Sequence, residues 1–233
     1  MSRESKNTLA SLDQGLIGRF RSDCKTEWQQ FINHRFVHEL ACGSLDPKEF
    51  KVFLVQDYFY LLEYCRVEAL AIYKSDNFED MNYFVTLIHG LLKVELPLHV
   101  SYCKKWGIEL NAMDASSKSL PLIAYGQYLL NKAMQGDLLD LIVLLMPCLV
   151  GYGEIGFRLA ENNSAKQENP YQSWIDLYAS DEYSRFVKDG LNYLEKLAQK
   201  YGAEARYPLL LSQFRMVVKL EISFWDVGRS VLL

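Results

Sequence analysis

One cysteine stands where a thiol could act on a substrate. Cys148 follows Pro147 inside 141–152, the most apolar stretch of the chain. A proline inside a helix removes one backbone hydrogen bond and opens the helix one turn back, which would let a substrate approach the sulfur. Activation of the thiol would have to come from another element, because no cationic side chain stands nearby on this stretch. A buried, inert cysteine is therefore the alternative, since free cysteine is among the most buried residue types.

Two acids stand in apolar, aromatic surroundings. Asp57 lies in the run Gln-Asp-Tyr-Phe-Tyr and Glu221 begins the run Glu-Ile-Ser-Phe-Trp. A buried carboxylate needs a partner or a task, and burial raises the pKa of a carboxyl toward neutrality, where it can act as general acid and base. The alternatives are a buried ion pair or hydrogen bond for Asp57 and a surface glutamate on the last helix for Glu221.

Several common catalytic motifs are missing. The chain has no P-loop, HExxH or GxSxG sequence, and its four histidines all lie before residue 100. Glu95 and His99 are four residues apart with no later histidine, whereas a di-iron bundle uses two Glu-x-x-His turns. We therefore expect no metal and no cofactor, and interpret His99 as an ordinary helix histidine. His34 could cap or anchor the chain at the end of the first helix.

The spacing of apolar residues is helical almost throughout, at three and four residues, and no alternating strand pattern appears. Asp46 and Pro47 give a sharp helix start, Pro97 should kink a helix, and Gly107 and Ser180 should end one helix and begin another. The polar stretch 162–169 is expected to be a loop. These signals predict one all-α domain spanning 1–233, with about eight helices near 9–32, 46–73, 82–106, 119–134, 138–160, 174, 180–201 and 207–231.

The composition limits the class of protein. The chain has 233 residues, 50% of them hydrophobic, which is enough to bury a core without a disulfide or a metal. Its net charge of −4 argues against nucleic acid or an anionic membrane as a partner. The five cysteines form no CxxC pair, and no signal peptide is visible, which fits a reducing cytoplasm. Fifteen tyrosines indicate a pocket lined with aromatic rings.

Sequence landmarks over roughly residues 15–228 resemble the TenA family, the thiaminase II enzymes of the haem-oxygenase-like helical fold. The landmarks are His34-Arg35-Phe36-Val37, Gly43-Ser44-Leu45, Phe50 with Gln56-Asp57-Tyr58-Phe59-Tyr60-Leu61, Glu95 with His99, Tyr125, Pro147-Cys148 with Gly151-Tyr152-Gly153-Glu154-Ile155-Gly156, Tyr171-Gln172-Ser173-Trp174-Ile175 with Tyr178-Ala179-Ser180, and Glu221 with Phe224-Trp225. The resemblance implies a haem-oxygenase-like bundle and a homotetramer.

The resemblance also implies a reaction, the conversion of 4-amino-5-aminomethyl-2-methylpyrimidine to the hydroxymethylpyrimidine, with thiamin itself cleaved as well. Cys148 matches the family's nucleophile, Glu221 its acid and base, and Asp57 the carboxylate that holds the pyrimidine. Five further positions match aromatic residues around the ring and the thiol. They are Tyr60, Tyr125, Tyr152, Tyr178 and Phe224.

Two positions depart from the family pattern. The family often has proline where Arg35 stands and tryptophan where Val150 stands, two residues after the cysteine. The second change alters packing beside the nucleophile and could widen the pocket. The alternative functions are a non-catalytic pyrimidine-binding or regulatory protein and a cofactor-using oxygenase or haem protein of the same fold. We expect Cys148, Asp57 and Glu221 to converge in one enclosed cleft.

Overall fold

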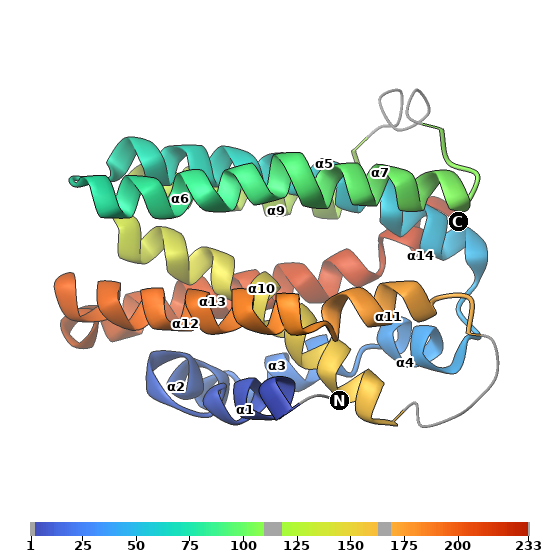
Figure 1. Cartoon of the computed structure of the whole chain (residues 1–233), viewed down its shortest axis with the longest axis horizontal. Coiled ribbons are helices and arrows are strands. Elements are labelled where there is room, and N and C mark those ends of the chain that lie inside the picture. Colours follow the sequence, from blue (N-terminus) through green and yellow to red (C-terminus); the bar gives the residue numbers. More distant parts are fainter. Residues whose placement is uncertain (1–2, 110–117, 163–168, 233) are drawn as a thin grey trace. The chain divides into compact units, whose positions relative to one another are not determined.

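The computed structural model describes residues 3–109, 118–162 and 169–232, and every regular element in these ranges is a helix (Figure 1). The predicted all-α class is therefore confirmed. The helices group into two compact units, each built from two chain segments. Unit 1 comprises Met1–Leu45 and Ile142–Ile222, and unit 2 comprises Asp46–Leu141 and Ser223–Leu233.

Each unit has its own set of helices. Unit 1 holds α1 (Arg3–Ser11), α2 (Gly15–Asp23), α3 (Lys25–Ile32), α4 (Arg35–Cys42), most of α10 (Leu138–Asn162), α11 (Gln172–Tyr178), α12 (Asp181–Lys200) and most of α13 (Ala203–Trp225). Unit 2 holds α5 (Pro47–Lys74), α6 (Phe78–Gly90), the π-helical segment η1 (Leu91–Glu95), α7 (Leu96–Lys105), α9 (Leu120–Gln135) and α14 (Val227–Leu232).

Helix α5 is the centre of unit 2, and α6, α7, α9 and α14 all pack against it. Its start follows the sequence signals, because the Asp46 side chain accepts a hydrogen bond from the Lys48 N–H and Pro47 occupies the first turn. Buried side chains occur on most of its circumference, as expected for a central helix. The long helix expected at 82–106 begins earlier, at Phe78, because Asn77 caps it.

The predicted disruption at Pro97 takes the form of a π-helical segment rather than a simple kink. Pro97 lies in the first turn of α7, directly after η1. Proline has no N–H to donate to the preceding turn, and a π segment accommodates the misfit by widening the helix. Gly107 then ends α7 with a φ of +72°, as the sequence predicted.

The single first helix expected at 9–32 is wrong. Three helices, α1, α2 and α3, share the apolar stripe instead. Gly15 has a φ of +60°, which stops a helix before α2, and Cys24 has a non-helical conformation between α2 and α3. The chain then turns at His34, whose Nδ1 accepts a hydrogen bond from the Phe36 N–H. His34 is therefore a cap, as expected, but it caps the start of α4 rather than the end of the preceding helix.

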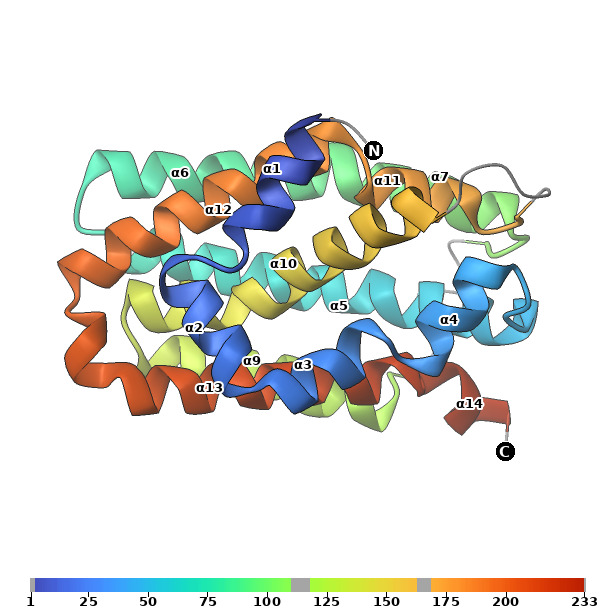
Figure 2. The same ribbon diagram turned by 90° about the horizontal axis from the view of Figure 1, so that it is seen from below.

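The later helices of unit 1 begin near the predicted places. The Asn169 side chain accepts from the Tyr171 N–H before α11, and the Ser180 hydroxyl accepts from the Tyr183 N–H at the start of α12. Helix α1 packs along α12 in this unit (Figure 2). Most of the expected loop at 162–169 lies outside the described residues. The last expected helix is two helices, because α13 ends at Trp225 before α14.

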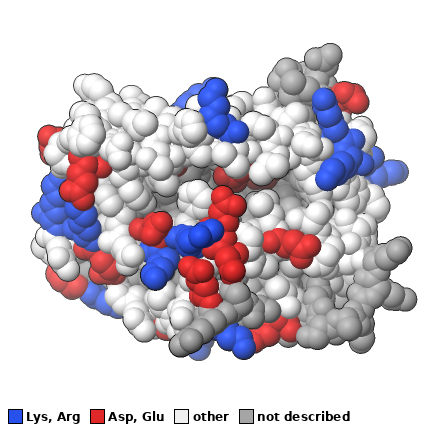
Figure 3. Space-filling view, in the orientation of Figure 1, with Lys and Arg blue, Asp and Glu red and all other residues white. Residues whose placement is uncertain are grey.

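Two helical stretches are long and apolar enough to cross a membrane by length and composition alone. The first is α10, whose apolar window over Leu138–Glu161 is 89% buried, as in the core helix of a globular protein. The second is the continuous helix Phe78–Lys105, whose apolar window is only 17% buried. Its outer face is turned toward the viewer in the upper half of Figure 3 and carries few charged side chains.

Candidate functional site

Three of the predicted substrate-binding aromatics meet in unit 2. The Tyr60 ring on α5 lies 4.8 Å from the Tyr125 ring on α9, and the Tyr60 hydroxyl donates to the Tyr125 hydroxyl over 3.2 Å. The Phe224 ring lies 5.8 Å from Tyr60 and 6.4 Å from Tyr125, centre to centre. All three side chains are buried. They form an aromatic cluster suited to contact with a flat heterocycle.

Asp57 lies one turn before Tyr60 on α5 and is only 5% exposed. Burial raises the pKa of its carboxyl to about 7. The nearest basic group given by the structure is the imidazole of His99 on α7, whose Nδ1 lies 3.6 Å from Asp57 Oδ2. Asp57 is thus a carboxyl that can change its charge near neutral pH, which suits recognition of a ring nitrogen together with an adjacent amino group.

Two side chains on α5 hold α9 in the position that brings Tyr125 onto Tyr60. The Gln56 side-chain oxygen accepts from the Ser119 N–H over 2.8 Å at the start of α9. The Glu63 carboxylate binds the Lys118 ammonium over 2.5 Å. Gln56 precedes Tyr60 on α5 and Glu63 follows it, so the two contacts fix the start of α9 on either side of Tyr60.

In unit 1, Cys148 is half-buried on α10, directly after Pro147. Three other cysteines are buried, and Cys42 is exposed. Cys148 is thus not fully buried, unlike the alternative expected for it, and the reactivity of its thiol stays a prediction. Tyr152 follows one turn later on the same helix and therefore shares the face of Cys148.

Tyr152 and Tyr178 belong to an aromatic cluster of unit 1. Their ring centres are 5.1 Å apart, and Trp174 lies 6.0 Å from Tyr152 and 4.6 Å from Tyr178. Gly156 makes this approach of α11 to α10 possible, because a Cβ atom there would lie 2.5 Å from the Tyr178 carbonyl carbon. Gly151 likewise gives the Phe31 ring its place against α10, since a Cβ there would lie 2.1 Å from that ring.

Glu221 lies on α13 and is 1% exposed, so the alternative of a surface glutamate is wrong. Phe224 follows three residues later on the same helix. The last helix buries this face because apolar residues recur there at helical spacing and Phe224 and Trp225 are themselves buried.

The structure places the predicted site residues in two sets. Unit 1 contains Cys148, Tyr152, Tyr178 and Glu221, and unit 2 contains Asp57, Tyr60, Tyr125 and Phe224. Within each set the aromatic residues come together as described above. The expected convergence of Cys148, Asp57 and Glu221 in one cleft stays a prediction.

Sequence reasoning missed the groups that face Asp57. His99 and Glu95 are four residues apart, so the spacing placed them on one helix face, but it did not show which helix that face meets. In the structure burial of its carboxyl and the charge of Asp57 raise the pKa of Glu95 to about 7. Within the described ranges, no group of three or more histidine, cysteine or acidic side chains could hold a metal ion.

The fold is the haem-oxygenase-like helical fold. A domain with that fold from Shewanella denitrificans superposes with a TM-score of 0.72 over 93% of both chains at 11% identity. A TenA family protein described as a transcription regulator, from Silicibacter sp. TM1040, superposes with a TM-score of 0.88 at 30% identity, over 94% of this chain and 98% of that one.

The model of the TENA/THI-4/PQQC family matches residues 21–230, and the chain belongs to this family. An aminopyrimidine aminohydrolase from Halalkalibacterium halodurans is 36% identical over 201 residues, 86% of this chain and 89% of that protein. The Saccharomyces cerevisiae hydroxymethylpyrimidine/phosphomethylpyrimidine kinase THI20 is 31% identical over 88% of this chain. The matching region makes up only 37% of the length of the kinase.

Proposed function

We propose that this protein is an aminopyrimidine aminohydrolase of thiamin salvage, which replaces the amino group of 4-amino-5-aminomethyl-2-methylpyrimidine with hydroxyl and also cleaves thiamin. The observation that carries the proposal is the buried Asp57 one turn from the Tyr60–Tyr125–Phe224 cluster. A carboxyl that can hold or release a proton beside flat aromatic walls suits a basic, planar pyrimidine. The aminohydrolase from Halalkalibacterium halodurans, with 36% identity, supports the same activity.

The proposed reaction begins with covalent addition. The Cys148 thiolate attacks an electron-poor carbon of the pyrimidine, so that a C–S bond forms and the electron pair moves into the ring. That electron pair then expels the amine from the exocyclic methylene, and Glu221 gives the departing nitrogen its proton. Asp57 favours this step by holding a proton on the ring nitrogen, which makes the ring a better electron acceptor.

The second half of the reaction restores the enzyme. Glu221, now a carboxylate, removes a proton from water, and the hydroxide oxygen bonds to the methylene carbon. The electrons return through the ring and break the C–S bond, which releases the thiolate and the hydroxymethylpyrimidine. One water is consumed and one ammonia is released, and Glu221 ends the cycle protonated as it began.

Product detection with the aminomethylpyrimidine and with thiamin tests this proposal. We expect Cys148→Ala and Glu221→Gln to abolish product formation while circular dichroism and thermal unfolding stay close to wild type. Cys42→Ala is the matched control, because Cys42 is exposed and lies outside the predicted site. Full turnover by Cys148→Ala would refute the role of the thiol.

A non-catalytic or regulatory role is the second candidate, favoured by the description of the Silicibacter protein as a transcription regulator. The two functions separate in one experiment. A regulator would bind the pyrimidine in calorimetry and give no product after long incubation, whereas an enzyme would release ammonia in proportion to pyrimidine consumed.

We further propose that the protein is cytoplasmic and assembles as a homotetramer. None of the five cysteines, which all lie within the described ranges, is in a disulfide, which fits a reducing compartment. Apolar side chains on the outer face of α6, η1 and α7 are exposed, among them Phe78, Val85, Leu92 and Leu98. A second copy of the chain would cover this face, and light scattering after gel filtration should give four times the chain mass. Val85→Glu with Leu92→Glu should lower that mass.

A further inference from the structure

The imidazole of His99 is fixed by two contacts within unit 2. Its Nε2 lies 2.9 Å from the Leu54 carbonyl oxygen, and its Nδ1 lies 3.6 Å from Asp57 Oδ2. A carbonyl oxygen only accepts hydrogen bonds, so Nε2 must carry a proton. In the neutral ring, Nδ1 is then a lone pair that points to a carboxyl oxygen. If Asp57 were ionised, this lone pair and the carboxylate oxygen would be two acceptors facing each other. A proton on Asp57 removes the conflict, because the carboxyl can then donate to Nδ1.

The surroundings favour the arrangement with a single shared proton. Burial lowers the pKa of His99, which opposes the imidazolium form, and burial raises that of Asp57, which opposes the carboxylate. The 3.6 Å separation is longer than a hydrogen bond, and a side-chain shift of roughly 0.7 Å closes it. Catalytic hydrogen bonds are often long in a ligand-free enzyme and tighten when substrate binds.

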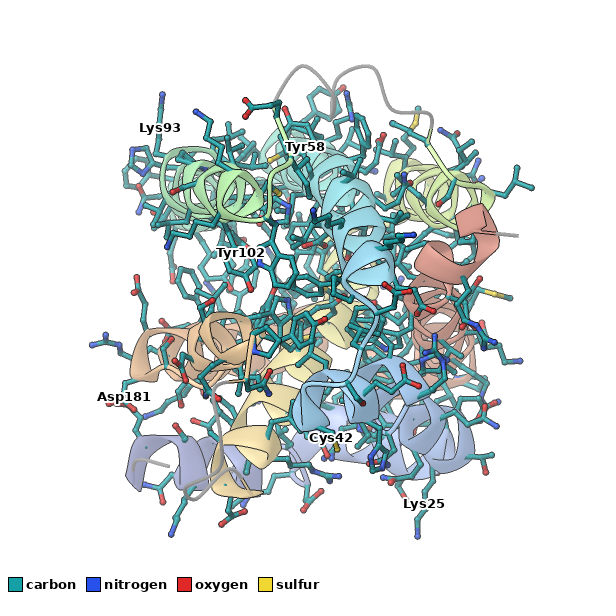
Figure 4. All side chains as sticks on the ribbon, turned by 90° about the vertical axis from the view of Figure 1, so that its right-hand side faces the viewer. Lys25, Cys42, Tyr58, Lys93, Tyr102 and Asp181 are labelled. Atoms are coloured by element: carbon teal, nitrogen blue, oxygen red, sulfur yellow. The ribbon has the colours of Figure 1, made fainter. Side chains whose placement is uncertain are left out.

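Other titratable groups near this pair act in the same direction. Burial first, and the charge of Asp57 second, raise the pKa of Glu95 of η1 to about 7 and that of Cys103 of α7 to about 12. Like charges repel, so a negative charge on Glu95 or Cys103 would make the carboxylate form of Asp57 less favourable. On α9, the Tyr125 hydroxyl accepts a hydrogen bond from the neighbouring Tyr60 hydroxyl. Figure 4 shows Lys93 of η1 pointing away from the helices into solvent.

We propose that His99 is a positioning residue for Asp57, anchored on the Leu54 carbonyl and sharing one proton with the carboxyl, so that Asp57 meets the pyrimidine in its protonated form. This inference rests on the proposed function. When the pyrimidine binds, the O–H bond of Asp57 breaks and an N–H bond forms on the ring nitrogen. Asp57 becomes a carboxylate beside the charged ring, and His99 stays neutral.

The tautomer of His99 can be tested without substrate. The chain has four histidines, so a long-range ¹⁵N–¹H spectrum of the imidazole nitrogens is simple, and the signals missing from His99→Gln identify His99. We expect a protonated Nε2 and an Nδ1 that accepts a hydrogen bond. The amide of asparagine donates a hydrogen bond at every pH. In Asp57→Asn, the His99 Nδ1 should therefore keep the ¹⁵N chemical shift of a hydrogen-bond acceptor from pH 6 to pH 9. A protonated Nδ1 with a bare Nε2 in the wild type would overturn the proposal.

The effect on recognition is measured as the dissociation constant of 4-amino-5-hydroxymethyl-2-methylpyrimidine between pH 5.5 and pH 9. Glutamine at 99 can still donate to the Leu54 carbonyl but has no group at the Nδ1 position. We therefore expect His99→Gln to bind normally near pH 6 and to lose affinity about one pH unit earlier than the wild type, a roughly tenfold loss near pH 8. Asparagine at 99 places an amide oxygen near the Nδ1 position, so His99→Asn should lose affinity at the same alkaline pH as the wild type.

His89→Gln is the control, because His89 is exposed on α6 of the same continuous helical stretch. An unchanged alkaline limb in His99→Gln would refute the positioning role, since a purely structural histidine would change affinity equally at every pH. Failure of the proposed function looks different. The wild type would then bind no pyrimidine at any pH, while the tautomer measurement would still report on the pair.

Discussion

Replacing Glu68 by glutamine should reduce the decrease in the free energy of unfolding that we expect as the pH rises. Glu68 lies on α5, is 3% exposed, and its Oε2 has no hydrogen-bond partner within the described part of the chain. Burial, together with the charge of Glu95, raises the pKa of Glu68 from 4.5 to about 8. Glu68 is therefore a proton-binding group that the fold keeps neutral.

The sign of the effect follows from proton linkage. Between about pH 4.5 and pH 8 the folded chain keeps the proton of Glu68 and the unfolded chain releases it. The folded state thus binds more protons in this window, so the free energy of unfolding falls as the pH rises. A shift of this size corresponds to a loss on the order of 3 kcal/mol between pH 5 and pH 8. Glutamine has no proton to lose, so this part of the slope should disappear in Glu68→Gln.

Urea unfolding at pH 5, 6, 7 and 8 measures the slope. The buried amide of glutamine adds an offset that does not depend on pH, so only the change between pH 5 and pH 8 counts. Asp76→Asn, an exposed acid of the same unit, should keep the wild-type slope. An equal slope in wild type and Glu68→Gln would refute the reasoning, because it would mean that Glu68 is ionised in the folded protein.

Three further changes should act in unit 1. Glu154→Ala should cost about 1–3 kcal/mol in urea unfolding, because the buried Trp28 N–H loses its acceptor and Arg21 keeps only its contacts to Asp13 and the Leu12 carbonyl. Gly156→Ala should cost about 1–3 kcal/mol and lower product formation, since the new Cβ pushes the Tyr178 backbone away; an active, equally stable variant would contradict the close approach. Ser180→Ala should lower the stability by about 1 kcal/mol in thermal unfolding, through loss of the cap on α12, with ligand affinity unchanged.

Local signals predicted the helices that carry strong caps. Asp46 with Pro47, Ser180 and Gly107 each define a boundary through chemistry within a few residues, and the structure has helix ends at all three. The stripe at 9–32 misled because apolar spacing continues through breaks in the backbone. Gly15 adopts a positive φ there, and the apolar spacing continues across the break because α1 and α2 both pack against α12.

The site was predictable in its parts and not in its pairings. Apolar surroundings marked Asp57 and Glu221 as buried acids, and both are buried. The meeting of Tyr60 with Tyr125 and of Asp57 with His99 depends on how helices distant in sequence align, and nothing in the spacing along one helix fixes that alignment. The tautomer of His99 followed only once the Leu54 carbonyl was seen beside it.

The wide turn at Leu91–Glu95 has a consequence for insertions and deletions. A π segment holds one residue more than the α-helical path needs, and each residue of a helix turns the next side chain by about 100°. Deleting a single residue there would let the stretch relax to an ordinary helix and rotate everything downstream by that angle. The imidazole that touches α5 would then face elsewhere, so the spacing between Gly90 and His99 should tolerate substitutions far better than changes in length.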